Sequence, residues 1–190
     1  MRCALAITAS LAVLCAPSLE ARADGSELPA GRFGVATGLR SNLGALGDEY
    51  RFGWMALGIE AGYHPTSMDE DWSFGVNWLV MVRGYLFASQ ASAVESSIGL
   101  TEMSGGLRMR RKIGVNPRFL LATAGGMLSR STDPLAPDGE RSYVGPYAGL
   151  GGEVMLWPGG IVGAELRYSM FPNGPESITL MIGISAGLNR

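Results

Sequence analysis

The feature that most constrains this chain is an alternation of apolar and small side chains at every second residue, repeated along most of its length. The closing segment shows it plainly, with Ile178, Leu180, Ile182 and Ile184 separated by Thr179, Met181 and Gly183. Successive side chains of a β-strand point to opposite faces of a sheet, so a period of two predicts strands. No run of about 18 or more apolar residues follows residue 23, so no transmembrane helix is predicted. The chain is therefore expected to be all-β.

Eight segments carry the alternation, and clusters of Gly, Pro, Asp and Asn separate them. The segments are residues 31–41, 52–64, 72–87, 94–110, 117–130, 143–157, 161–171 and 178–188. In 94–110 the alternation loses its phase near Ser104, Gly105 and Gly106, which predicts a β-bulge there. The connections form two alternating sets, as expected for strands that run up and down beside their sequence neighbours.

The two faces of these segments differ in a way that separates a membrane barrel from a soluble sheet. A soluble sheet carries Lys, Glu and Thr toward water, whereas the less apolar face here is mostly Gly, Ala and Ser with occasional Glu or Arg. Such a face suits the lining of a narrow barrel, and the continuous apolar face then suits lipid. We therefore predict an eight-stranded antiparallel up-and-down transmembrane β-barrel, in one domain over residues 24–190.

The alternation assigns individual side chains to the two sides of this barrel. The residues predicted to face lipid are Leu57, Ile59, Val76, Trp78, Val80, Leu166, Leu180 and Ile182. The charged residues predicted to face the lumen are Glu60, Arg83, Glu153, Glu165 and Arg167. Met55 falls on the lipid side by the same count, and aromatic residues near the segment ends, among them Phe171, are expected to form girdles at the membrane surfaces.

The first 23 residues differ from the rest and are typical of a secretory signal peptide. A positively charged start and an apolar run over residues 3–16 end at Pro17. Ala21 and Ala23 then supply the small residues that a signal peptidase recognises, which predicts cleavage after Ala23. We expect the protein to be exported.

Three stretches of the chain resemble the small outer-membrane β-barrel family of Gram-negative bacteria, which includes the barrel domain of outer membrane protein A. They are PYAGLGGEVML at 146–156, the WPGG turn at 157–160 and GAELRYSM at 163–170. The resemblance covers residues 31–188 and implies an outer-membrane location, contact with outer-membrane lipid and insertion by the barrel-assembly machinery. Chains of this family usually finish on an aromatic residue, whereas this one finishes on Gly187, Leu188, Asn189 and Arg190.

Few residues have the spacing of a catalytic or ligand-binding motif. The AGLGGEV stretch at 148–154 lacks the G-x-G-x-x-G spacing of a dinucleotide site. His64, the only histidine, opens HPTSMDED at 64–71, where Ser67 and an acidic residue would be its partners in a hydrolase, although a polar turn is expected. The acids of this stretch also lack the spacing of a calcium loop. We predict no catalytic residue, no metal and no cofactor.

The charges of the chain are nearly balanced, with 15 Lys and Arg against 17 Asp and Glu, so nucleic acid is not an expected partner. The basic run RMRRK at 108–112 is expected to be a solvated turn, with contact to anionic lipid or peptidoglycan as the alternative. The lumen charges are expected to form an ion-pair plug, and the alternative is a narrow gated polar pathway.

The sequence favours a non-enzymatic outer-membrane protein with a structural or surface-interaction role, and with weak passive porin activity as an addition. Two other classes stay open, a lipid-modifying hydrolase and a soluble periplasmic ligand-binding barrel. Neither the partner or solute nor the oligomeric state follows from the sequence.

Overall fold

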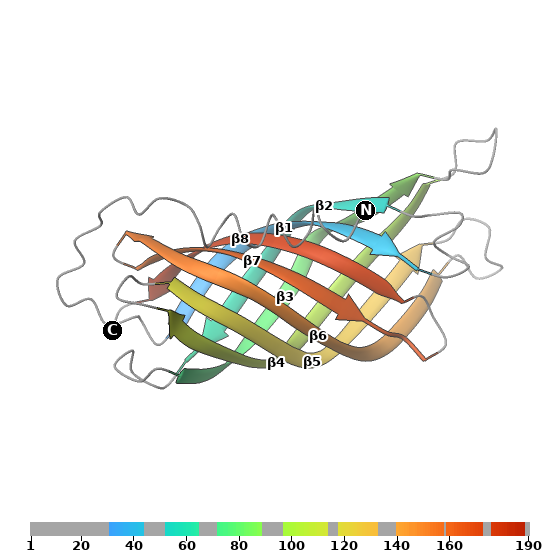
Figure 1. Cartoon of the computed structure of the whole chain (residues 1–190). Helices are drawn as coiled ribbons and strands as arrows, with labels where there is room; N and C mark the ends of the chain where they lie inside the picture. Colours follow the sequence, from blue (N-terminus) through green and yellow to red (C-terminus); the bar gives the residue numbers. More distant parts are fainter. Residues whose placement is uncertain are drawn as a thin grey trace, which may run out of the picture.

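Eight antiparallel β-strands close into a barrel in the computed structural model of this chain (Figure 1). The structure describes residues 31–43, 52–64, 72–88, 97–113, 118–132, 140–157, 159–172 and 176–188. The strands are β1 (Gly31–Asn42), β2 (Phe52–Tyr63), β3 (Trp72–Ala88), β4 (Ser97–Ile113), β5 (Arg118–Thr132), β6 (Glu140–Trp157), β7 (Gly160–Ser169) and β8 (Ser177–Leu188). None of these described segments forms a helix that is long and apolar enough to cross a membrane.

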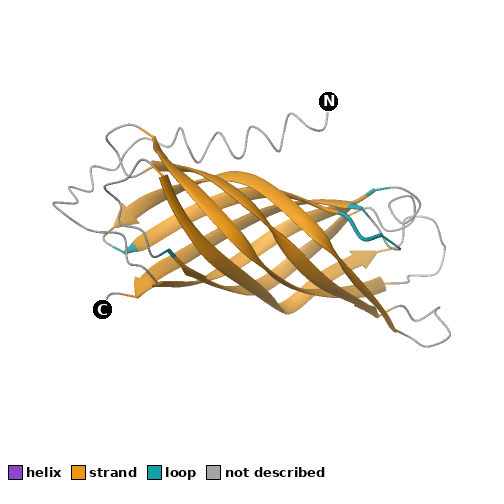
Figure 2. Cartoon of the chain, turned by 90° about the horizontal axis from the view of Figure 1, so that it is seen from below, coloured by secondary structure: helices purple, strands orange, loops and turns teal. Residues whose placement is uncertain are grey.

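Each strand pairs with its sequence neighbours, and the antiparallel pairing of β1 with β8 closes the sheet. In that pairing Gly31 lies opposite Leu188, and Asn42 lies opposite Ser177. We call the end of the barrel at Gly31 and Leu188 the terminal end, and the end at Asn42 and Ser177 the opposite end. The strands run obliquely around the barrel (Figure 2), as closure of a sheet requires. The predicted all-β, eight-stranded antiparallel architecture is confirmed.

The strand boundaries agree with the alternation to within a few residues, but the predicted bulge in β4 is wrong. Ser104, Gly105 and Gly106 continue the register without interruption against both β3 and β5. The pairing of β3 with β4 is irregular elsewhere, between Val80 and Tyr85. The alternation changes phase because the apolar residues change face: Leu100 is buried inside the barrel, whereas Met103 and Leu107 are exposed on its outside.

An irregularity in β2 places Met55 inside the barrel rather than on the lipid side. Ala36 of β1 lies opposite Gly58, whereas Gly38, two residues later, lies opposite Met55, so β2 contains one extra residue. One extra residue reverses the side on which the following side chains lie. Leu57 accordingly points outward and is 39% exposed, whereas Met55 is fully buried. The assignment of Met55 to the lipid side is therefore wrong.

Large apolar side chains cover the outside of the barrel. The outer face includes the exposed residues Leu57, Trp78, Val80 and Ile182 and the half-buried residues Ile59, Val76, Leu166 and Leu180. Leu107, Val144 and Leu150 are each 70% exposed. Phe171 differs from the other aromatic residues near the strand ends, because it is buried and packs against Tyr143 inside the barrel. The expectation that Phe171 belongs to an aromatic girdle is wrong.

Inward-facing glycines leave space for the larger side chains of the interior. A Cβ atom on Gly149 would lie 2.7 Å from Thr123 Oγ1 and closer still to Glu165 Oε1. A Cβ atom on Gly163 would lie 3.1 Å from Glu153 Cγ. The glycines of the inner wall are therefore a packing requirement of its charged residues.

The turn between β6 and β7 requires a glycine, because Gly159 has a φ of +80°. We expect Gly159→Ala to lower the free energy of unfolding by about 1–2 kcal/mol, since a Cβ atom is strained in the left-handed region. Urea denaturation of the refolded barrel in detergent measures this loss. Gly126→Ala is the control, because a Cβ atom there meets nothing within 4 Å. Equal losses in the two variants would contradict the requirement.

Candidate functional site

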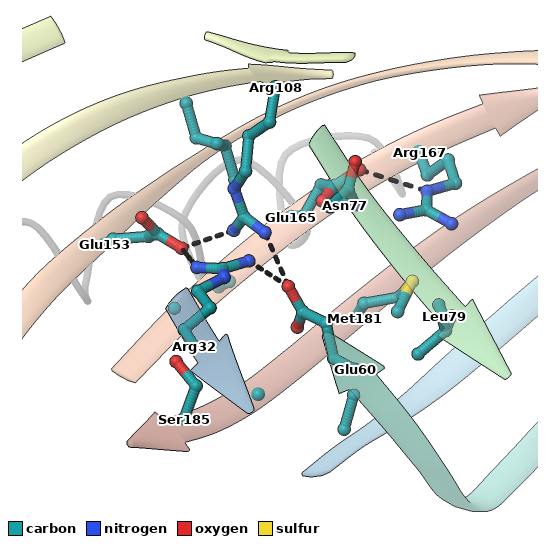
Figure 3. A pocket seen from close by; sticks show the side chains of 15 residues that line it. Arg32, Glu60, Asn77, Leu79, Arg108, Glu153, Glu165, Arg167, Met181 and Ser185 are labelled. Atoms are coloured by element: carbon teal, nitrogen blue, oxygen red, sulfur yellow. Dashed lines mark hydrogen bonds and ion pairs between the residues drawn. The ribbon is translucent and has the colours of Figure 1, made fainter. Parts of the chain in front are cut away.

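Two carboxylates bind three guanidiniums in the part of the lumen near the terminal end. Glu153 of β6 lies 2.6 Å from Arg32 Nη1 and 2.6 Å from Arg110 Nε, and it also pairs with Arg108. Glu60 of β2 pairs with Arg32 and lies 2.5 Å from Arg108 Nη1. Arg32 and Arg108 therefore lie between the two carboxylates (Figure 3). We call these five residues the terminal cluster.

The terminal cluster is almost completely removed from solvent. Arg32, Arg108, Arg110 and Glu153 are buried, and the side chain of Glu60 is 15% exposed. Buried charges are tolerated only when they are paired and hydrogen-bonded. Because the five side chains come from β1, β2, β4 and β6, their ion pairs join these strands across the lumen.

His64 follows β2 and lies in the interior next to the terminal cluster. Its ring faces Gly75 of β3, where a Cβ atom would lie 2.5 Å from His64 Nδ1. Burial of the ring, together with the positive charges of Arg110 and Arg32, lowers the pKa of His64 to about 3. The imidazole is therefore neutral at pH 7.

A second polar group lies among β4, β5, β6 and β7. Arg167 donates from Nε to Glu165 Oε1 and from Nη1 to Ser104 Oγ, both at 3.0 Å. Thr123 Oγ1 donates to the same oxygen of Glu165 at 2.6 Å. The guanidinium of Arg167 also lies 4.2 Å from the centroid of the Tyr147 ring, within the range of a cation–π contact. Glu165 and Arg167 are thereby held by the three strands before β7.

Arg40 and Glu102 form a further ion pair closer to the opposite end. Their side chains are 0% and 3% exposed, so this pair is also buried. Arg40 donates from Nε to Asn42 Oδ1 at 2.9 Å, and its guanidinium lies 5.9 Å from the centroid of the Phe171 ring. The interior is therefore charged at more than one level along the barrel.

An apolar layer lies in the lumen on the side formed by β1, β2, β3, β4 and β8, next to the Glu165–Arg167 pair. It consists of Ala36, Met55, Leu79, Met81, Leu100 and Met181. The cavity next to this layer is small, with a volume of about 30 Å³. The described part of the lumen is therefore filled with side chains and is not an open channel.

Four of the five charges predicted to face the lumen lie in the interior: Glu60, Glu153, Glu165 and Arg167. The side chain of Arg83 lies outside the described residues. The prediction omitted five further interior charges, which are Arg32, Arg40, Glu102, Arg108 and Arg110. Arg32 and Arg40 are in phase with Ala36 on the small-residue face of β1, so the same count along the strand identifies them.

The basic run RMRRK at 108–112 is part of a strand, and its assignment to a solvated turn is wrong. Because β4 continues to Ile113, its period of two turns Arg108 and Arg110 into the lumen and Arg111 outward. The guanidinium of Arg111 lies 5.1 Å from the centroid of the Trp72 ring on the neighbouring strand. This arrangement could not be recognised in the sequence, because three cations in four residues give no contrast between the inward and outward faces of a strand.

The described residues contain no group of three or more His, Cys, Asp and Glu side chains that could hold a metal ion. The partners that a hydrolase would need near His64, which are Ser67 and the acids at 69–71, lie outside the described residues. Within the described residues, the lumen carboxylates of Glu60, Glu102, Glu153 and Glu165 are each bound by arginine, so their geometry is that of ion pairs. The arrangement holds the strands of the barrel together, and nothing in it indicates acid–base chemistry.

Solved structures that share this fold include small eight-stranded outer-membrane barrels. One is Neisserial surface protein A, which has a TM-score of 0.57 and is 17% identical in sequence. The match covers 84% of this chain and 97% of that protein. Another is Ail, the attachment invasion locus protein of Yersinia pestis, solved in complex with the heparin analogue sucrose octasulfate. It has a TM-score of 0.54 and 17% identity, and the match covers 84% of this chain and 97% of Ail. No family model and no curated protein matches the sequence. The chain has the fold of the small eight-stranded outer-membrane barrels, as its resemblance to that family implied.

The terminal cluster predicts a large effect of one substitution. We expect Glu153→Gln to lower the free energy of unfolding by about 3–5 kcal/mol, because three buried guanidiniums are then left with one carboxylate. Urea denaturation of the refolded barrel, followed by tryptophan fluorescence, measures the change. Glu176→Gln removes an exposed carboxylate beside β8 and should change stability by no more than about 0.5 kcal/mol. Similar losses in both variants would show that Glu153 does not hold the cluster together.

Proposed function

We propose that this protein is an integral outer-membrane barrel with a closed lumen and a structural or surface-interaction role. The observation that carries the proposal is the contrast between its two surfaces: the outer wall is apolar, and the lumen is filled with paired charges. The proposal includes export by the signal peptide over residues 1–23, insertion by the barrel-assembly machinery and contact with outer-membrane lipid.

The outer wall supports insertion into lipid. Trp78 is 50% exposed near the middle of β3, and Leu150 is 70% exposed on β6, with further apolar side chains on every neighbouring strand. Soluble proteins rarely expose contiguous apolar patches larger than a few hundred Å². A bilayer also requires that every backbone N–H and C=O group is satisfied within the protein, which closure of β1 onto β8 achieves.

The up-and-down topology supports a role for the opposite end in surface interaction. Strands β1, β3, β5 and β7 run toward this end and lead into four connections there, whereas β2, β4 and β6 run toward the terminal end. The proposal places the terminal end on the periplasmic side, so that the four connections of the opposite end face the exterior. The partner that they contact is not defined by any motif of the sequence.

The filled lumen supports a plug in preference to a pathway. A permeating ion would have to pass the buried apolar side chains of Met55 and Met181, and Glu165, which lies opposite Met181, is already bound by Arg167. It would also have to separate the Arg40–Glu102 pair, whose side chains are buried. Weak passive porin activity is therefore the second candidate, favoured only by the polar character of the inner wall.

Fractionation tests the membrane location. We expect the full chain to stay in the membrane fraction until detergent is added, and to migrate differently on a gel before and after boiling. Recovery from the soluble periplasmic fraction would contradict the proposal and favour the soluble ligand-binding barrel.

Leu150→Arg provides a second test of the same proposal. It should lower the free energy of unfolding in bilayers by about 2–4 kcal/mol if Leu150 faces lipid near the midplane. Ser142→Arg, at an exposed position of β6 close to the opposite end, is the control and should cost less. No loss at Leu150 would show that this wall faces water.

Single-channel recording separates the plug from the pathway. We expect no conductance steps from the wild-type barrel in planar bilayers, and none from Glu165→Ala or Arg167→Ala, because the apolar layer is intact in all three. Steps in the wild type that change in either variant would overturn the plug and establish a gated polar pathway.

A further inference from the structure

Strand β3 contains local extra residues relative to the strands on both sides of it. Between the pair Val80–Met103 and the pair Tyr85–Leu100, β3 has the four residues 81–84, whereas β4 has only two. Extra residues of this kind disrupt the backbone ladder and bend the strand that contains them. The pairing of β3 with β4 is therefore interrupted over a short distance in the middle of the wall.

The neighbouring strand β2 is irregular at the same level. Gly58 of β2 lies opposite Met81, and the residue before Gly58 lies opposite Arg83, so the irregularities of the two strands adjoin. On the other side of β2, Thr37 Oγ1 donates a hydrogen bond of 2.6 Å to the backbone carbonyl oxygen of Met55. This bond lies where the extra residue of β2 interrupts the pairing with β1, so a side chain supports the backbone at the break.

We call residues 55–58 of β2 and 81–84 of β3 the irregular stretch. The apolar layer of the lumen lies directly behind it, since the inward side chains of Met55 and Met81 belong to that layer. These side chains pack around Gly58, where a Cβ atom would lie 3.1 Å from Leu79 Cδ1 and 3.4 Å from Met55 Sδ. Methionine side chains are flexible and adapt to apolar partners of different shapes. The interior at this level therefore suits an apolar occupant.

The outside of the wall is also apolar at this level. Leu57 of β2, Val80 of β3 and Met103 of β4 point outward, and their exposed fractions are 39%, 46% and 51%. The irregular stretch therefore separates two apolar environments, which are the surroundings of the outer wall and the apolar layer of the lumen.

We propose that the wall opens sideways at the irregular stretch and admits an acyl chain of the bilayer to the apolar layer. Fewer ladder bonds have to break there than in the ladders on both sides of β5, whose register is uninterrupted. An acyl chain is the ligand because it lies against the outer wall and offers only apolar surface to Met55 and Met81. The opening leads from lipid into the lumen and not along it, so the plug stays closed to ions. This inference rests on the proposed membrane location, and the experiment is chosen so that the two can fail separately.

Photoreactive methionine, which carries a diazirine, tests the access of lipid to the lumen. The barrel is produced with this analogue, inserted into phosphatidylcholine vesicles and illuminated, and acyl adducts are located by mass spectrometry. Met103 and Met170 are exposed on the outer wall and should carry adducts. Met55 and Met81 should carry adducts as well, because the opening exposes them. Met127 is the matched control, since it is buried in an apolar cluster behind the uninterrupted ladders of β5, and it should carry none.

The pattern of adducts separates the two proposals. Adducts at Met103 and Met170 with none at Met55 or Met81 would overturn the lateral opening and leave the membrane location intact. No adduct at any methionine would contradict the membrane location, and the opening would fail with it. Adducts at Met127 as abundant as those at Met55 would show that acyl chains enter without regard to the irregular stretch, which would also overturn the inference.

A disulfide across the interrupted ladder tests the place of the opening. The chain has no cysteine after residue 23, and Val80 and Met103 lie directly opposite each other with both side chains outward. Oxidised Val80→Cys with Met103→Cys should lose the adducts in the apolar layer, and reduction of the disulfide should restore them. Leu128→Cys with Val144→Cys is the matched control, because it joins opposite outward residues of β5 and β6, and it should keep the adducts when oxidised. Migration before and after boiling confirms that each variant is folded, and adducts that persist in the first variant when oxidised would overturn the inference.

Discussion

The interior of a closed eight-stranded barrel is only as wide as the side chains that fill it, and this limit determines what each inward position can hold. A large charged residue fits only where its neighbours are small, which is why Gly149 lies beside Glu165 and Gly163 beside Glu153. Charges that are confined in this way cannot reach water and must bind one another. The ion pairs, the glycines and the apolar layer around Met55 all result from this one restriction of volume.

We expect the ion pairs of the lumen to contribute more to specificity than to net stability. Burying an arginine and a glutamate costs desolvation that their attraction only partly offsets, whereas removing one partner leaves a costly unpaired charge. Glu153 binds arginines from β1 and β4, so a shift of β6 by one residue would break several pairs at once. This interdependence fixes the register of strands whose inner faces are otherwise rich in glycine and serine.

Much of this architecture could be predicted from the sequence, because the membrane-type barrel imposes a period of two over whole strands. The prediction failed where the period was hidden. Gly105 and Gly106 have no side chains that could indicate which face of β4 is apolar. The basic run at 108–112 shows no contrast between the inward and outward faces of that strand. At Met55 an extra residue in β2 reversed the phase, which only the pairing with β1 reveals. The partners of the charges could not be predicted, since Arg32 and Glu153 are 121 residues apart and meet through closure of the sheet.

Closure itself has a consequence for how the molecule acquires its structure. All strand pairs join sequence neighbours except β1 with β8, whose contact spans nearly the whole chain from Gly31 to Leu188. Hairpins form quickly because their contacts are local, whereas the final seam requires the two ends of a long chain to meet. Until that meeting, β1 and β8 are open edges with unpaired backbone groups, which invite pairing with another chain. The seam is therefore the step at which correct folding of this barrel competes with aggregation.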